Sequence, residues 1–137
     1  MCVICAPDSP LIQRASLSMG ELENSEWILR EPGSGSREFF SYVPSHQDLN
    51  TGMKLFQLNT TEALINSVSA GLGLGCLSKL SAEPAINDGR VVEIKLPLDM
   101  KRRYWLLVHK EKYQSPLLKT FIQFLLSVAQ RIDPLSR

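Results

Sequence analysis

The chain has 137 residues, of which 44% are hydrophobic and 21% charged, and its formal net charge is +1. This is the balance of one globular domain, and so small a net charge does not by itself indicate binding to nucleic acid or to an acidic membrane surface. No hydrophobic run approaches the length of a membrane span and no signal-peptide pattern opens the chain, so we expect a cytoplasmic protein with no membrane partner.

The hydrophobic pattern predicts strands and helices that alternate along the chain, which defines an α/β fold. The predicted strands span residues 2–6, 26–30, 54–58, 76–78, 91–96 and 104–109. The predicted helices span residues 17–22, 34–42, about 60–72, 80–86, and the segment from 115 onward. A polar segment at 46–52 is predicted to be a loop.

The first predicted strand carries two of the three cysteines, Cys2 and Cys5, and the third is Cys76. Cys2 and Cys5 have the spacing of a metal knuckle or a redox motif. However, residues three apart in a strand point to opposite faces, and no second cysteine pair or histidine cluster completes a zinc site. We therefore predict buried, reduced thiols and no metal.

A glycine-serine turn, Gly33–Ser36, joins the strand at 26–30 to the following helix. Such a turn leaves amide donors and hydroxyls at the positive end of the helix dipole, which suits a carboxylate, sulfate or phosphate. Asn59–Thr61 forms a second helix start of the same kind. Helix N-termini gather at the carboxyl edge of an open α/β sheet, where ligands bind. Two interpretations stay open here, an anion site and a pair of simple helix caps.

The other motifs do not indicate catalysis or a cofactor. Gly71–Cys76 lacks the last glycine of a dinucleotide fingerprint and follows a helix, so we interpret it as a helix end followed by a buried strand. His46 and His109 form no triad, and solvated or capping roles are expected for both. Lys101–Arg103 is a short basic run, either a solvated turn or a phosphate contact. We therefore predict neither an enzyme nor a bound cofactor.

The last segment begins with Ser115 as a cap and Pro116 at the first helical position. Its apolar stripe predicts a helix that packs on a sheet. The stripe consists of Leu118, Phe121, Leu125 and Val128.

The order of these motifs resembles the effector-binding domain of LysR-type transcriptional regulators. The resemblance rests on Cys5–Leu11, Trp27–Arg37, Thr61–Ser78, Gly89–Val92, Tyr104–Lys110 and Ser115–Leu125. It extends over almost the whole chain.

The resemblance implies a type II periplasmic-binding-protein-like fold, with two α/β lobes and an effector cleft between them. Residues 1–98 would be the second lobe, and residues 99–137 a segment returning to the first lobe with a strand and a helix. The winged helix-turn-helix and most of the first lobe would be absent. Apolar surface around Tyr104, Trp105, Phe121 and Leu125 would then be exposed, which predicts self-association.

The resemblance also implies a site and a mechanism. The implied effector-binding residues are Gly33, Ser34, Gly35, Ser36, Arg37, Thr60 and Thr61. The expected partner is a small anionic metabolite that shifts the lobes, while DNA binds only through the absent N-terminal domain of a homo-oligomer.

Two other functions are compatible with the same fold. One is a solute-binding module without a DNA reader. The other is an enzyme with two such lobes, which would need acid–base residues, and only Glu38 and Glu62 lie near the predicted site.

Overall fold

The computed structural model describes residues 1–14, 17–42, 54–96, 100–102 and 104–132. The chain divides into two compact units, unit 1 (Met1–Arg102) and unit 2 (Arg103–Arg137). Among the described residues, no helix is both long and apolar enough to cross a membrane.

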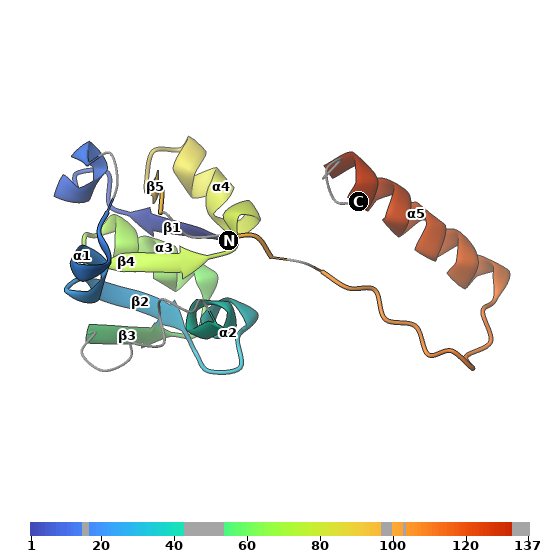
Figure 1. The fold of residues 1–137 in the computed structure, drawn as a ribbon. Coiled ribbons are helices and arrows are strands. Elements are labelled where there is room, and N and C mark those ends of the chain that lie inside the picture. The colour runs from blue at the N-terminus through green and yellow to red at the C-terminus, as the bar shows by residue number, and fades with distance from the viewer. Residues whose placement is uncertain (15–16, 43–53, 97–99, 103, 133–137) are drawn as a thin grey trace. The chain divides into compact units, whose positions relative to one another are not determined.

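Unit 1 is built on one mixed five-stranded sheet with the strand order β3-β2-β4-β1-β5 (Figure 1). The strands are β1 (Cys2–Cys5), β2 (Glu26–Arg30), β3 (Lys54–Leu58), β4 (Leu74–Leu77) and β5 (Val92–Ile94). β2 runs parallel to both β3 and β4, whereas β1 is antiparallel to β4 and to β5. The three parallel strands therefore share one carboxyl edge, which is where ligands bind in open α/β sheets.

Helices cover both faces of this sheet (Figure 1). They are η1 (Pro10–Gln13), α1 (Met19–Glu23), α2 (Gly35–Tyr42), α3 (Thr61–Ser69) and α4 (Lys79–Asn87). Each face of the sheet has its own cluster of buried side chains. Ile28 packs with Leu64 and Val68 of α3 on one face, and Trp27 packs with Phe40 of α2 on the other. Since side chains alternate along a strand, successive residues of β2 pack into the two cores in turn. Helices α2 and α3 therefore lie on opposite faces of the sheet.

The predicted strands and helices of unit 1 are confirmed, with small shifts at their ends. β2 and β3 have the predicted bounds. α1 begins two residues later than predicted because Ser18 and Glu21 form a capping box. Gly71, in the turn that follows α3, has φ of 79°. All four residues of β4 are buried. The interpretation of Gly71–Cys76 as a helix end before a buried strand is therefore confirmed.

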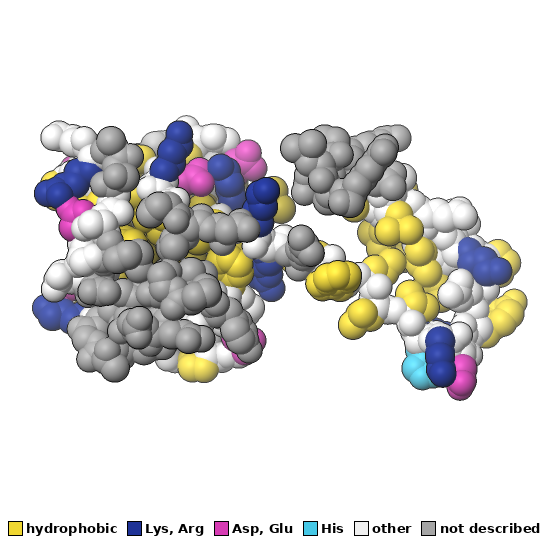
Figure 2. Space-filling view, in the orientation of Figure 1, with side chains coloured by type: hydrophobic (Ala, Val, Ile, Leu, Met, Phe, Trp, Pro, Cys, Tyr) yellow, Lys and Arg dark blue, Asp and Glu magenta, His cyan; other side chains and the backbone are white. Residues whose placement is uncertain are grey.

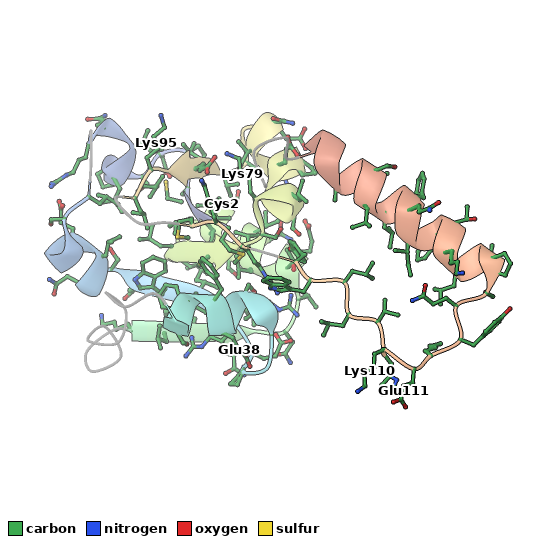
Figure 3. The ribbon with its side chains drawn as sticks, turned by 45° about the vertical axis from the view of Figure 1, so that its right-hand side comes forward. Cys2, Glu38, Lys79, Lys95, Lys110 and Glu111 are labelled. Carbon is green, nitrogen blue, oxygen red and sulfur yellow. The ribbon has the colours of Figure 1, made fainter. Side chains whose placement is uncertain are left out.

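The three cysteines are free and buried, as predicted. Cys2 belongs to the core that contains α3, and Cys5 to the core that contains α2, because their side chains point to opposite faces of β1. Figure 3 shows Cys2 close to α4, near Lys79. Burial raises the pKa of the Cys2 thiol to about 11 and that of Cys76 to about 12, so both stay protonated at neutral pH.

Unit 2 contains helix α5 (Pro116–Ile132), as predicted, but not the predicted strand. Residues 104–109 have no regular secondary structure. A strand needs a neighbour that pairs with its backbone, and the described residues of unit 2 include no other strand. For the same reason the sheet on which α5 was expected to pack is absent from the described part of unit 2.

Unit 2 exposes many large hydrophobic side chains, which Figure 2 shows gathered on its surface. Tyr104, Trp105 and Phe121 are exposed by 74%, 78% and 53%, in agreement with the prediction. Leu125 is only half-buried, so its predicted exposure is corrected. Leu118 and Val128, on the same side of α5, are half-buried as well.

Candidate functional site

The turn before α2 places several donors at the carboxyl end of β2. Gly33 has φ of 87°, a conformation that favours glycine. The Ser34 amide donates to the Glu31 carbonyl at 3.1 Å, and the Ser34 carbonyl accepts the first helical bond from Glu38 at 3.0 Å. The amides of Gly35 and Ser36 precede that first bond, so the helix supplies no acceptor for them. These amides can donate to a ligand.

The two serine hydroxyls of this turn lie 3.1 Å apart, Ser34 Oγ to Ser36 Oγ. One hydroxyl proton serves this bond, and the other remains for a further acceptor. Arg37 follows at the next helical position and is half-buried. Its carbonyl accepts a bond from Ser41 Oγ at 3.2 Å, which belongs to the helix rather than to a ligand site.

The start of α3 is a second helix N-terminus. Thr60 is its cap: Thr60 Oγ1 accepts from the Ala63 amide at 3.1 Å, and the Thr60 carbonyl accepts from the Leu64 amide at 3.2 Å. The Thr60 hydroxyl oxygen is therefore engaged in capping. Thr61 has a separate role, because its hydroxyl faces the end of β2.

The sheet brings these two helix starts to the same edge. β2 and β3 are neighbouring parallel strands in which Arg30 pairs with Leu58. α2 follows β2 on one face, and α3 follows β3 on the other. A crevice between such diverging connections is the usual ligand position in an open α/β sheet. The Arg30 guanidinium connects the end of β2 to the start of α3, since its Nη1 donates to Thr61 Oγ1 at 2.9 Å.

Arg30 was not among the residues predicted for the site. Its guanidinium forms two bonds to the Glu31 carboxylate, Nε to Oε2 at 2.7 Å and Nη2 to Oε1 at 2.9 Å. The hydrogen bond from Arg30 lowers the pKa of Glu31, and the same bond raises the pKa of Arg30. Because Glu31 balances its charge, Arg30 orients Thr61 more than it attracts an anion. Its place at the end of a strand was the available sequence signal.

Arg102 is a second residue that the sequence did not assign to the site. A Cβ built on Gly35 would lie 3.2 Å from Cζ and Nη1 of Arg102 and would contact Nη2 more closely still. The guanidinium of Arg102 therefore lies against the first residue of α2. Of the two interpretations of the run Lys101–Arg103, this position is compatible with an anion contact by Arg102; Arg103 lies outside the described residues.

The remaining ionisable residues near the site do not form an acid–base pair. Glu38 and Glu62 are exposed in the first turns of α2 and α3, where they complement the helix dipoles; Glu38 is labelled in Figure 3. Glu62 also pairs with Arg90 at 3.2 Å. His109 is exposed and accepts a bond from the Glu111 amide, while His46 lies outside the described residues. Among the described residues, no group of three or more potential metal ligands occurs.

A shallow cavity of about 400 Å³ lies at the opposite edge of the sheet. It is lined by residues around the end of β1 and the amino ends of β2 and β4, including Asp8, Glu26 and Gly73. None of the residues predicted for effector binding contributes to it.

The chain matches the model of the LysR substrate binding domain over residues 1–130. The chain belongs to this family. Relatives agree with the assignment. This chain is 36% identical to the HTH-type transcriptional regulator YeiE of Escherichia coli (strain K12) over 124 residues. The match covers 89% of this chain and 41% of that protein. It is 34% identical to the RuBisCO operon transcriptional regulator of Allochromatium vinosum over 135 residues, or 95% of this chain and 43% of the relative.

Solved structures show the same fold. The regulatory domain of CcmR from Synechocystis PCC6803, solved in complex with 2-PG, has a TM-score of 0.80 and 22% identity over 93% of this chain and 61% of that chain. The effector-binding domain of QuiR, solved in complex with shikimate, has a TM-score of 0.68 and 19% identity over 95% of this chain and 61% of the other.

These matches establish the fold class and the family of the LysR-type domain. The fold is a mixed α/β sheet of the type II periplasmic-binding-protein-like class. The relatives are named as transcriptional regulators and not as enzymes, which agrees with the prediction that the chain is a binding domain. The chain spans less than half the length of the two curated relatives described here.

Proposed function

We propose that the chain is the effector-binding part of a LysR-type transcriptional regulator and that it senses a small anionic metabolite. The observation that carries this proposal is the meeting of two helix N-termini, those of α2 and α3, at the carboxyl edge of β2. The Arg30–Thr61 hydrogen bond of 2.9 Å joins the end of β2 to the start of α3 at this edge. Amide and hydroxyl donors at one edge of the sheet suit a carboxylate, sulfate or phosphate group.

Some of the proposed effector-binding residues would donate hydrogen bonds to the ligand, and the others would hold the backbone of the site in place. Gly35, Ser36 and Arg37 would offer amides, and Ser34 or Ser36 would offer a hydroxyl. Gly33 makes the turn possible, Thr60 caps α3, and Thr61 would present its hydroxyl to the ligand beside Arg30.

The proposed mechanism is a shift between open and closed arrangements of two lobes. Residues 1–98 would form the second lobe and residues 99–137 the segment that returns to the first lobe. An effector that binds the closed arrangement better would move the lobes, and a homo-oligomer would transmit this movement to a DNA-binding domain outside this chain. We place the protein in the cytoplasm, where such a regulator meets DNA.

Anion titrations of this chain test the proposed site. The probes are sulfate, phosphate, 2-PG and shikimate, the last two taken from the CcmR and QuiR structures. The wild-type chain is compared with Ser36→Ala and Thr61→Val. Ser69→Ala is the matched control, because it removes a hydroxyl at the last residue of α3, at the other end of the helix from Thr61. At 100 times its dissociation constant, a ligand stabilises the chain by about 2.7 kcal/mol, which thermal unfolding resolves.

We expect a saturable shift that Ser36→Ala and Thr61→Val weaken and Ser69→Ala retains. A shift that is equal in all four proteins would place the anion elsewhere, and no saturable shift with any probe would contradict the anion site. The solute-binding module remains the second candidate. Sequence upstream of this chain distinguishes the two, because a helix-turn-helix followed by a long helix defines the regulator.

A further inference from the structure

We propose that the cavity at the amino edge of β2 and β4 is a second binding site, and that it takes a small organic cation, an amine with an apolar body. This site is independent of the proposed anion site, because none of the residues proposed to bind the effector lines the cavity.

The backbone of the turn between α3 and β4 forms one wall of the cavity. Gly71 and Gly73 line it and have φ of 79° and 154°. The Gly73 backbone lies against the start of β2, since a Cβ there would be 2.5 Å from the Glu26 carbonyl oxygen. The glycines therefore let this turn close one side of a space of about 400 Å³, which is within the range of small-molecule sites.

Several lining residues offer apolar surface to a ligand. β1 is antiparallel to β4, so the end of β1 lies beside the start of β4. Cys5, Ala6 and Leu74 come from this region and are buried. Leu72 also lines the cavity, but it is 57% exposed. An apolar ligand body that covers Leu72 would remove this surface from water, which favours binding.

The described charged residues that line the cavity are acidic. Asp8 is exposed, and within the described ranges it forms no ion pair. Glu26 pairs with Lys54 at 3.2 Å, but the two side chains are 44% and 77% exposed. Exposed pairs of this kind contribute little, and a carboxylate accepts several hydrogen bonds at once. Both carboxylates can therefore accept from an ammonium group.

Helix α3 adds negative potential at the same place. The helix ends at Ser69, and the residues that follow its cap, Gly71 and Leu72, line the cavity. A helix C-terminus carries a partial negative charge, which a cation complements. The last turn of α3 contains no basic residue that would do so. A bound ammonium group would supply this charge.

The cavity does not favour covalent chemistry at its cysteine. Burial raises the pKa of the Cys5 thiol, a hydrogen bond with Ser9 lowers it, and the charge of Asp8 raises it again. The thiol therefore stays protonated at neutral pH, so we expect reversible binding. The effect of Asp8 on this buried thiol also shows that its charge reaches the wall of the cavity.

The measurement is an NMR titration of the chain that follows the amide signals of Leu72 and Gly73 at constant ionic strength. The probes are benzylamine, which is protonated at neutral pH, and benzyl alcohol, which has the same apolar body without the charge. A dissociation constant on the order of millimolar is expected for a cation of this size. Benzylamine should bind about tenfold more tightly than benzyl alcohol, because it alone interacts with the carboxylates and the helix end.

Nearly isosteric variants test the contribution of each group. Asp8→Asn and Glu26→Gln should each weaken benzylamine binding by about threefold and leave benzyl alcohol binding unchanged. Leu72→Ser should weaken both probes. Glu62→Gln, at the other end of α3, is the control for a lost carboxylate, and Leu80→Ser on α4 is the control for a lost exposed leucine. Both controls should bind as the wild-type chain does.

Three outcomes would overturn this inference. The first is a wild-type chain whose Leu72 and Gly73 signals show no saturable change with benzylamine. The second is benzyl alcohol that binds as tightly as benzylamine. The third is benzylamine binding that is the same in Asp8→Asn, Glu26→Gln and the wild-type chain. None of these results bears on the anion site, which the sulfate and phosphate titrations test separately.

Discussion

Arg30 Nη1 donates a hydrogen bond of 2.9 Å to Thr61 Oγ1, and this bond joins the end of β2 to the start of α3. The two residues lie 31 positions apart in the sequence. The bond crosses the point where the connections after β2 and β3 diverge to opposite faces of the sheet. It fixes the direction of a hydroxyl at the position where we propose that the effector binds.

A double-mutant cycle measures this relationship. Arg30→Gln and Thr61→Val, singly and together, should reveal a coupling energy of about 1 kcal/mol in the free energy of unfolding, since a charged donor strengthens the bond. The exposed contact from Arg90 Nη1 to Asn66 Oδ1 at 3.1 Å is the control pair, and its coupling should be smaller. Equal couplings in the two cycles would show that the Arg30–Thr61 bond is no more than a surface contact.

The Arg30–Glu31 pair predicts a dependence of stability on pH. The hydrogen bond from Arg30 lowers the pKa of Glu31 in the folded chain. A carboxylate with a lowered pKa stabilises the fold above its unfolded pKa of about 4.3, and this contribution is lost as pH falls through the folded value. The difference in unfolding free energy between wild type and Glu31→Gln should therefore be largest near neutral pH and should disappear in acid.

Urea denaturation at a series of pH values provides this measurement. The control is the same substitution in an Arg30→Gln background, where the hydrogen bond from Arg30 is absent. If Glu31→Gln has the same pH-dependent effect in that background, the stabilisation does not come from Arg30.

A third prediction concerns the glycine that joins α3 to β4. Gly73 has φ of 154°, and a Cβ there would lie 2.5 Å from the carbonyl oxygen of Glu26. Gly73→Ala should destabilise unit 1 by roughly 2 kcal/mol or more, because it adds a clash with the backbone to an unfavourable φ. Gly71→Ala is the matched control, since Gly71 has φ of 79° but open space around it. Chemical denaturation that finds the two variants equally stable would mean that backbone strain alone requires Gly73.

Local patterns in the sequence were sufficient for most of unit 1. β2 and β3 were predicted at their observed bounds, and Thr60 was predicted within the cap of α3, because alternation and capping depend on neighbouring residues. The wrong strand at residues 104–109 shows the limit of this approach. Its composition favours a strand, but strand formation also needs a partner, which composition does not supply.

The candidate site, too, was predictable from the sequence only where neighbouring residues determine the structure. The turn at Gly33–Ser36 was visible in the sequence because glycine and serine have local conformational roles. Arg30 and Arg102 were not, since their importance comes from contacts with Thr61 and Gly35 that only the folded sheet brings together. Long-range contacts of this kind leave no periodic signal in a single sequence.

The exposed apolar side chains of unit 2 predict self-association. Trp105, Leu107 and Leu117 are exposed by 78%, 88% and 79%, and Phe124 by 60%. Exposed apolar surface of this kind favours association, so the apparent mass by light scattering should rise with protein concentration.

The variant that tests this prediction is Phe121→Ser combined with Phe124→Ser on α5, which should shift the protein toward the monomer. The control is Leu80→Ser on α4 of unit 1, which removes a side chain that is 71% exposed outside unit 2 and should leave association unchanged. A wild-type chain that stays monomeric at every concentration contradicts the prediction. Association that Leu80→Ser weakens as much as the double variant does would assign the contact to unit 1 instead.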